Sequence, residues 1–179
     1  MSVDIFKILL VGDGAVGKTT TIRQFIDQKF NEDYKLTLGV AFFVQTVCIE
    51  QNAIVKLVIW DISDEVKLKP FRWLYYKGVN GVFAIFDLTR YGTFNPGIIK
   101  WVTEIRQFAG DVPVILIGNK NDLVDLREVN GQEALEYANT ILCPYLETSA
   151  KTGKNIHNAF LILAKELVQR KETEYTSIP

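Results

Sequence analysis

Residues 12–19 read Gly-Asp-Gly-Ala-Val-Gly-Lys-Thr, and this stretch decides the fold of the chain. An apolar run from Ile8 to Val11 precedes it, and apolar residues at helical spacing, beginning at Ile22, follow it. Strand, glycine-rich turn and helix form the context of a phosphate-binding loop. Its glycines let backbone N–H groups turn inward as an anion-binding nest, and the helix N-terminus adds a positive dipole end. The stretch predicts that Lys18 reaches the outer phosphates and that the Thr19 hydroxyl binds Mg²⁺.

The same residues also spell Gly-x-Gly-x-x-Gly, which two other nucleotide sites share. A dinucleotide site needs an acidic residue about 20 positions further on, at the end of a second strand. Glu32 and Asp33 lie near that distance, but no strand pattern precedes them. A kinase glycine loop would be accompanied by His-Arg-Asp and Asp-Phe-Gly, which the sequence lacks. A plain glycine turn would not explain Lys18-Thr19, so the phosphate-binding loop is the favoured interpretation.

Size and composition describe one ordinary globular domain. The chain has 179 residues and a net charge of −1, with no basic cluster, which argues against a general nucleic-acid binder. We expect residues 1–173 to form the domain and residues 174–179 a short tail. Cys48 and Cys143 lie far apart and are expected to be reduced packing residues. His157, the single histidine, is expected at the surface or at a helix cap.

Targeting signals are absent from the sequence pattern. No apolar run is long enough to span a bilayer, and no secretion signal is visible at the N-terminus. Ser2 follows Met1, so the myristoylation pattern is missing, and residues 176–179 contain no cysteine for prenylation. We therefore expect a cytoplasmic monomer that reaches membranes only through partners.

Apolar periodicity divides the chain into alternating strands and helices. Strands are predicted at 6–11, 42–50, 55–61, 81–86, 112–117 and 145–147, and helices at 20–28, 96–108, 131–140 and 156–170. Residues 51–52 are predicted to form a tight turn between two antiparallel strands, residues 30–39 an irregular functional loop, and residues 63–77 a partly helical segment. This order predicts an α/β fold of the P-loop NTPase type: a mostly parallel six-stranded sheet with one antiparallel strand and helices on both faces.

Two further motifs follow predicted strands, where ligands of such sheets bind. Asp61 ends the third strand, and a carboxylate beside a phosphate-binding loop is expected to hold Mg²⁺, usually through water. Residues 119–122 read Asn-Lys-Asn-Asp. The Asp122 carboxylate can accept hydrogen bonds from N1–H and the 2-amino group of guanine, whereas adenine would leave it without partners. We expect Lys120 to lie flat against the base and Asn119 to tie the loops together.

Together these motifs resemble the small GTPases of the Ras superfamily over nearly the whole chain. The resemblance rests on residues 12–19, Thr37, Trp60-Asp61, residues 119–122 and the run Thr148-Ser149-Ala150-Lys151. It implies that GTP or GDP binds with Mg²⁺, and that Thr37 and the segment from Asp61 to about Tyr76 belong to two switch regions that the γ-phosphate and Mg²⁺ order.

The resemblance also assigns roles to single residues. Phe30 would pack edgewise on the guanine and Tyr34 would cover the phosphates, while the Ala150 N–H would meet the guanine oxygen with Lys151 alongside. The expected nucleotide-binding residues are Gly14, Ala15, Val16, Gly17, Lys18, Thr19, Thr20, Phe30, Tyr34, Thr37, Asn119, Lys120, Asp122, Ser149, Ala150 and Lys151. The expected Mg²⁺ ligands are Thr19, Thr37 and Asp61, and the expected catalytic residues are Lys18, Thr37 and Glu65.

Within that superfamily the chain is most similar to the Rab branch, whose members act in vesicle trafficking. Residues 37–42 read Thr-Leu-Gly-Val-Ala-Phe, which is similar to the Rab switch I sequence. Phe42, Trp60 and Tyr75 fall where Rab proteins carry an aromatic triad that effectors contact. The resemblance implies that effectors, exchange factors and GTPase-activating proteins bind at the switch regions and this triad. The alternative is that the three residues are core or half-exposed aromatics without such a role.

One segment departs from the family pattern. Where the family has Asp-x-Ala-Gly-Gln, this chain reads Asp61-Ile62-Ser63-Asp64-Glu65. Glutamine can donate and accept hydrogen bonds, whereas ionised glutamate only accepts. One like-charge contact with the phosphates at about 4 Å would cost roughly 4 kcal/mol at an effective dielectric near 20.

This departure leaves three outcomes open: slow hydrolysis, a preference for GDP, or a second switch that swings these side chains outward. We expect a slow GTPase, and the alternative is a hydrolysis-deficient pseudo-GTPase that acts as a nucleotide-bound scaffold. An adenine-nucleotide kinase or ATPase is disfavoured by Asp122.

Overall fold

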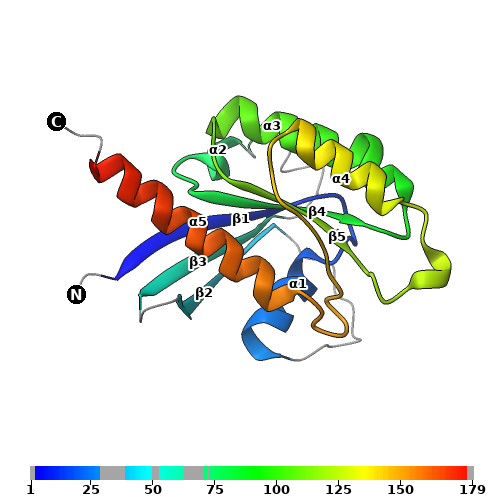
Figure 1. The fold of residues 1–179 in the computed structure, drawn as a ribbon, viewed down its shortest axis with the longest axis horizontal. Helices are drawn as coiled ribbons and strands as arrows, with labels where there is room; N and C mark the ends of the chain where they lie inside the picture. Colours follow the sequence, from blue (N-terminus) through cyan, green and yellow to red (C-terminus); the bar gives the residue numbers. More distant parts are fainter. Residues whose placement is uncertain (1–2, 29–38, 50–52, 63–70, 72, 177–179) are drawn as a thin grey trace.

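A six-stranded sheet forms the centre of the computed structural model, which describes residues 3–28, 39–49, 53–62, 71 and 73–176 (Figure 1). The strand order is β2-β3-β1-β4-β5-β6, and every neighbouring pair is parallel except β2 and β3. The strands are Asp4–Val11 (β1), Val40–Cys48 (β2), Ile54–Ile62 (β3), Gly81–Asp87 (β4), Val114–Asn119 (β5) and Tyr145–Glu147 (β6). The predicted mostly parallel sheet with one antiparallel strand is confirmed.

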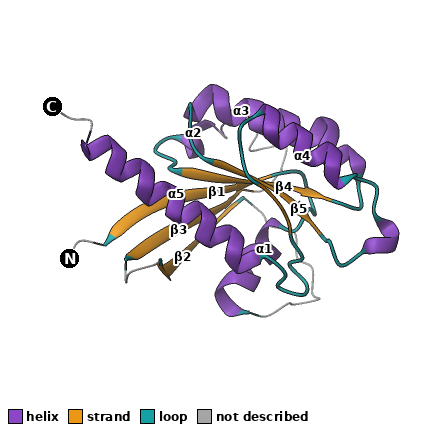
Figure 2. Cartoon of the chain, viewed as in Figure 1, coloured by secondary structure: helices purple, strands orange, loops and turns teal. Residues whose placement is uncertain are grey.

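Helices cover both faces of this sheet (Figure 2). One face packs against α1 (Lys18–Asp27) and α5 (Ile156–Thr176), and the other packs against α2 (Trp73–Tyr76), α3 (Ile99–Ala109) and α4 (Gly131–Thr140). Two short helical segments, η3 (Thr93–Ile98) and η4 (Val124–Leu126), precede α3 and α4. The chain therefore has the three-layer arrangement that alternating strands and helices favour.

The core consists of two clusters, one on each face of the central strands. Every residue of β4 and β5 is buried, as expected for parallel strands with helices on both faces. On α5 the predicted apolar stripe is confirmed, since Ile156, Phe160 and Leu163 are at most 2% exposed. The Phe160 ring stacks on Phe25 of α1 with a centroid distance of 3.8 Å. Burying a side chain of this size contributes about 1.5–3 kcal/mol, so this stripe fixes α5 on the sheet.

Element boundaries agree with the sequence predictions at one helix and differ at another. The helix predicted at 96–108 starts directly after a break, because Asn95 has an extended backbone (φ −124°, ψ 115°), and the residues from Pro96 on continue into α3, which ends at Ala109. A residue that precedes proline disfavours the helical region, and Asn95 precedes Pro96. The last helix continues to Thr176, past its predicted end at Arg170 and through the predicted domain boundary at residue 173. The predicted turn at 51–52 and most of the segment 63–77 lie outside the described residues.

Of the two cysteines, Cys48 does not lie where it was expected. The structure exposes Cys48 on β2, so the prediction that it packs in the interior is wrong. The period of two along a strand puts Cys48 on the same face as Phe42 and Val44, which are more than half exposed. Cys143 is partly buried, which raises the pKa of its thiol to about 11.

His157 lies exposed in the first turn of α5, as expected. Among the residues that the structure describes, none of the helices combines the length and apolarity that crossing a bilayer requires.

Candidate nucleotide-binding site

The glycine-rich loop between β1 and α1 needs glycine at two of its positions. Gly12 has a φ of +143°, and a Cβ there would lie 2.1 Å from the carbonyl oxygen of Ile85 on β4. Gly17 has a φ of +100°, and its Cβ would lie 2.3 Å from the Nδ2 atom of Asn119. Between them Ala15 has a φ of +62°, a conformation that is rare for a residue with a side chain. Left-handed residues that alternate with right-handed ones turn successive N–H groups to one side, which is the geometry of an anion nest.

The start of α1 adds further donors to this loop. Its N-cap is Gly17, which carries no side-chain acceptor for the first N–H groups of the helix. Lys18 is 7% exposed, and its Nζ atom donates to the carbonyl oxygens of Gly12 (2.8 Å) and Asp13 (3.0 Å). The ammonium group thus lies against the loop itself. Helix dipole, N–H groups and ammonium together make this loop a site for an anion.

Thr19 and Asp61 meet at the carboxyl end of β3. The Thr19 hydroxyl donates a hydrogen bond to Oδ2 of Asp61, whose side chain is fully buried. A hydroxyl and a carboxylate are oxygen donors of the kind that Mg²⁺ prefers, and Mg²⁺ takes most of its other ligands from water and phosphate. Within the described ranges, no three His, Cys, Asp or Glu side chains gather as a separate metal site. The two side chains fit a Mg²⁺ ion that phosphates help to hold.

Asn119, the last residue of β5, connects three loops. Its Nδ2 donates to the carbonyl oxygen of Val16 at 2.9 Å, and its Oδ1 accepts from the Thr148 hydroxyl and the Ala150 N–H, both at 3.1 Å. The side chain is 1% exposed, so these bonds satisfy a buried amide. The expectation that Asn119 ties the loops together matches this geometry. In this structure the Ala150 N–H is directed at Asn119.

Asp122 lies in the loop that follows β5. Its Oδ1 accepts a hydrogen bond from the Ser149 hydroxyl at 2.6 Å, and Ser149 is fully buried. This bond uses one carboxylate oxygen of Asp122 and fixes the orientation of the other. Because a carboxylate has about four acceptor positions, Asp122 retains the capacity to accept two N–H groups of a purine.

One cavity of about 450 Å³ joins the glycine-rich loop to these two loops. Its lining residues are Ala15, Gly17, Thr20, Asn119, Lys120, Asp122, Leu123, Ala150 and Lys151. The residues come from the carboxyl ends of β1, β5 and β6, which lie in one sheet. The structure therefore brings eight of the predicted nucleotide-binding residues to one cavity, while Gly14, Val16, Lys18, Thr19 and Ser149 are not among its lining residues. Four expected site residues, Phe30, Tyr34, Thr37 and Glu65, and with them Asp64, lie outside the described residues.

Sequence reasoning missed Asp87, which ends β4 beside this cavity. Asp87 is fully buried, and its Oδ2 meets Lys120 Nζ at 2.6 Å and Arg90 Nε at 2.8 Å. Burial by itself raises the pKa of Asp87, but hydrogen bonds from Lys120, Thr89 and Arg90 outweigh it, so the pKa lies below its usual value. A carboxylate at the carboxyl end of a buried strand was a signal that could have found it, as it did for Asp61.

Two contacts from α3 and the loop before it hold the glycine-rich loop from outside. Arg90 Nη2 donates to the carbonyl oxygen of Gly14 at 2.9 Å, and the Trp101 indole Nε1–H donates to Oδ1 of Asp13 at 2.9 Å. Neither Arg90 nor Trp101 stands in a recognisable motif, so the sequence offered no signal for them.

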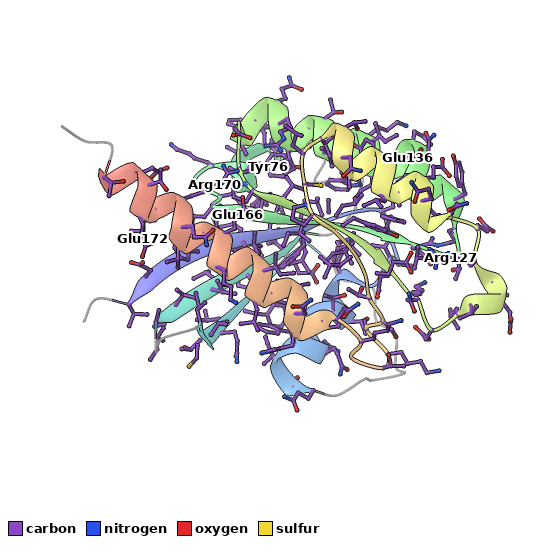
Figure 3. All side chains as sticks on the ribbon, in the orientation of Figure 1. Tyr76, Arg127, Glu136, Glu166, Arg170 and Glu172 are labelled. Atoms are coloured by element: carbon purple, nitrogen blue, oxygen red, sulfur yellow. The ribbon has the colours of Figure 1, made fainter. Side chains whose placement is uncertain are left out.

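Glu147, which sequence reasoning also missed, supports the base-side loop. It accepts hydrogen bonds from both terminal nitrogens of Arg127, from the Tyr145 hydroxyl (2.9 Å) and from Asn121 Nδ2 (2.6 Å). The bonds from Arg127 are the main cause that lowers the pKa of Glu147. Asn121 lies between Lys120 and Asp122, so the Glu147 carboxylate fixes the loop that carries both residues. Arg127 is labelled at the right of Figure 3, at the carboxyl ends of the strands.

The three aromatics of the predicted triad do come together. Phe42 on β2 is the register partner of Trp60 on β3, and their rings pack edge to face at 4.5 Å. Tyr75 of α2 lies 6.2 Å from Trp60. The Lys7 ammonium sits 3.8 Å from the centre of the Trp60 ring, a cation–π contact. Phe42 is 58% exposed, so this cluster forms part of the surface.

Fold and site together define a P-loop protein with a nucleotide cavity at the carboxyl ends of a parallel sheet. Comparison with known proteins agrees with this class. The model of the Ras family matches residues 7–169. The GTP-binding protein ypt1 of Schizosaccharomyces pombe (strain 972 / ATCC 24843) is 36% identical over 167 residues, which cover 93% of this chain and 81% of that protein. The chain belongs to the Ras family, and the prediction of a Rab-like small GTPase is confirmed.

Proposed function

We propose that this chain is a guanine-nucleotide switch that binds GTP and GDP with Mg²⁺ and hydrolyses GTP slowly. The observation that carries the proposal is the cavity of about 450 Å³ that residues of the glycine-rich loop line together with Lys120 and Asp122. An anion nest next to a carboxylate held by Ser149 fits a molecule with phosphates at one end and a guanine at the other.

Each described residue has a role in this proposal that follows from its position. Lys18 and the N–H groups from Ala15 to Thr20 bind the phosphates. Thr19 and Asp61 hold Mg²⁺, which neutralises phosphate charge when it is bound. Lys120 lies along the base and Asp122 accepts its N1–H and 2-amino protons. Thr37, Phe30 and Tyr34 complete the site as the family resemblance implies.

Slow hydrolysis is proposed from Asp64 and Glu65, which occupy the family positions of glycine and glutamine. An ionised Glu65 cannot donate a hydrogen bond, and either carboxylate near the phosphates is repelled by them. A loss of 1.4 kcal/mol in transition-state stabilisation already slows a reaction about tenfold. The second candidate, a pseudo-GTPase scaffold, rests on the same two residues and differs in turnover.

The experiment that tests the proposal begins with the purified protein. Mass spectrometry of the released nucleotide should find GDP or GTP, and competition should favour guanine over adenine nucleotides when Mg²⁺ is present. Retention of ATP in preference to GTP, or of neither, would contradict the proposal.

Single-turnover hydrolysis of bound GTP then separates the two candidates. The slow switch predicts conversion of GTP to GDP that is slower in wild type than in Glu65→Gln, because glutamine restores a donor for the attacking water. No conversion by either protein would favour the scaffold. Wild-type hydrolysis as fast as that of an ordinary small GTPase would remove the claim of slow turnover.

We also propose that Phe42, Trp60 and Tyr75 form a docking surface for effector, exchange and activating proteins, through which the chain reaches membranes. The exposed Phe42 ring and the cation–π contact of Lys7 with Trp60 support a surface that is preformed rather than induced. Phe42→Ala should weaken effector binding without changing GDP affinity, which isothermal titration can measure.

A further inference from the structure

Asp87 connects the two halves of the cavity through charged side chains. Its Oδ2 lies 2.6 Å from Nζ of Lys120, on the base side, and 2.8 Å from Nε of Arg90. Arg90 in turn donates from Nη2 to the carbonyl oxygen of Gly14, in the glycine-rich loop, at 2.9 Å. We call this chain of contacts, Lys120–Asp87–Arg90–Gly14, the Asp87 bridge.

The carboxylate at the centre of the bridge is fully satisfied. Its other oxygen, Oδ1, accepts from the N–H (2.9 Å) and the hydroxyl (2.7 Å) of Thr89. A buried carboxylate is costly unless it is ionically paired and hydrogen-bonded, and breaking such a pair from one side leaves an uncompensated charge. Asp87 therefore anchors Lys120 and Arg90 together rather than separately.

Arg90 can make both of its contacts because its guanidinium is a planar fork. Nε faces Asp87 and Nη2 faces Gly14, so one rigid group spans two acceptors. Lysine has the same charge but a single point of donation. The structure thus uses the arginine for its shape as well as for its charge.

The bond to Gly14 determines where the next N–H group points. In a trans peptide the C=O and the following N–H point in opposite directions. Arg90 holds the Gly14 carbonyl outward, so the N–H of Ala15 faces the opposite way, toward the cavity that Ala15 lines. Asn119 does the same at the next bend, where it holds the Val16 carbonyl and so directs the Gly17 N–H. The two contacts flank Ala15, whose φ of +62° needs external support.

We propose that Arg90 and Asp87 are positioning residues that aim the Ala15 N–H at a bound phosphate and couple its orientation to the base-side Lys120. The inference rests on the proposed function, because it presumes a guanine nucleotide in the cavity. The bridge makes nucleotide retention a joint property of both loops. A disturbance at the base side loosens the phosphate side as well.

The test compares the release of a fluorescent GDP analogue from wild type, Arg90→Gln and Arg90→Lys, each chased with excess GDP in the presence of Mg²⁺. Arg90→Gln should release the nucleotide about tenfold faster, the size expected when one charge-assisted hydrogen bond at a site is lost. Arg90→Lys should restore the ion pair with Asp87 but not the second contact, so its release should stay several-fold faster than that of wild type.

Arg106 provides a matched control at the opposite end of the sheet. Its Nη1 also contacts one carboxylate, Asp111 (2.7 Å), and one carbonyl oxygen, that of Val112 (2.9 Å). Arg106→Gln should lower the melting temperature less than Arg90→Gln, because Asp111 is 86% exposed whereas Asp87 is buried, and it should keep GDP release within about twofold of wild type. The proposed role of the Asp87 bridge would be contradicted if both variants accelerated GDP release equally. It would also be contradicted if Arg90→Gln released GDP within twofold of the wild-type rate.

A double-mutant cycle tests the coupling itself. Asp87→Asn should speed release in the wild-type background. In the Arg90→Gln background it should add only the part that acts through Lys120, because the contact to Gly14 is already gone, so the double variant should fall short of the product of the two single effects. Independent, multiplicative effects would overturn the coupling. A wild-type protein that retains no guanine nucleotide would instead overturn the proposed function, which distinguishes the two failures.

Discussion

The two edges of the sheet treat polar side chains in opposite ways. Buried polar side chains occur at the carboxyl edge: the described residues of this kind are Lys18, Thr21, Asp61, Asp87, Thr93, Asn119, Thr148 and Ser149, all at or next to that edge. At the amino edge the paired carboxylates keep contact with solvent, since the side chain of Asp4 is 28% exposed and that of Asp111, which meets Arg106 and Arg170, is 86% exposed. Figure 3 labels Arg170 at the left of α5, far from Arg127 at the right.

This difference shows where the fold accepts an energetic cost. Removing a charge from water is expensive unless partners replace the hydration, whereas exposed ion pairs contribute about 0–1 kcal/mol. A chain selected for stability alone would gain little from burying Asp61 and Asp87. Their burial at one edge marks that edge as the place where preorganised charge is useful, and function is the reason that remains.

The largest effect on nucleotide binding at the carboxyl edge is expected from a substitution at Asp122. Asp122→Asn replaces an acceptor with a donor, so guanine loses its two-bond partner while xanthine, which has a carbonyl in place of the 2-amino group, gains one. We expect GDP affinity to fall by about 2 kcal/mol or more, roughly thirtyfold, and xanthosine diphosphate to bind better than to wild type. Competition titrations with both nucleotides measure this. An unchanged preference would show that Asp122 does not contact the base.

An intermediate effect is expected when acid titrates the carboxyl edge. Glu147 has a pKa below its ordinary value of 4.5, mainly because Arg127 donates to it. A depressed carboxylate stabilises the native state fully above the unfolded pKa, and the stabilisation is lost as pH falls through the folded pKa. The free energy of unfolding should therefore decrease below about pH 4.5.

Glu147→Gln separates this group from the other carboxylates. At neutral pH the variant should be about 1–3 kcal/mol less stable, because Arg127 loses its charged partner. Its stability should then fall less steeply with acid than that of wild type. Urea denaturation between about pH 3 and pH 7 tests both statements, and parallel curves would refute the assignment to Glu147.

The smallest effect is expected at the amino edge. Asp111→Asn removes exposed contacts to Arg106 and Arg170, and exposed pairs contribute about 0.2–1 kcal/mol. Thermal unfolding should shift by a few degrees at most, and GDP release should stay as in wild type. A large loss of nucleotide affinity in this variant would break the contrast between the edges.

Most of the fold could be predicted because its signals are local. Residues 12–19 determined the first strand, turn and helix, and the alternation of apolar runs determined the sheet and its one antiparallel strand. The helix predicted at 131–140 and the strand at 145–147 have the observed bounds. The extension of α5 to Thr176 was missed because propensity alone places helix ends poorly.

The residues of the site could be predicted where they stand in a recognisable motif, as in residues 12–19 and 119–122. The structure places eight of the predicted nucleotide-binding residues around one cavity. Arg90 and Glu147 were missed because each contacts a partner distant in sequence, and such a contact leaves no mark on the neighbouring residues. Asp87 was missed although it ends a buried strand, as Asp61 does, because no motif surrounds it. Arg90 and Gly14 are 76 positions apart, and only the sheet order makes them neighbours.

The indole of Trp101 gives the protein an optical reporter of its own. Its N–H is bonded to the Asp13 carboxylate at 2.9 Å, inside the loop proposed to hold the phosphates. Indole fluorescence responds to the charge and polarity beside the ring. A rearrangement of Asp13 during nucleotide exchange should therefore change the fluorescence emission of Trp101. The chain has three tryptophans, and replacing Trp60 and Trp73 with phenylalanine would leave this one as a label-free sensor of loop occupancy.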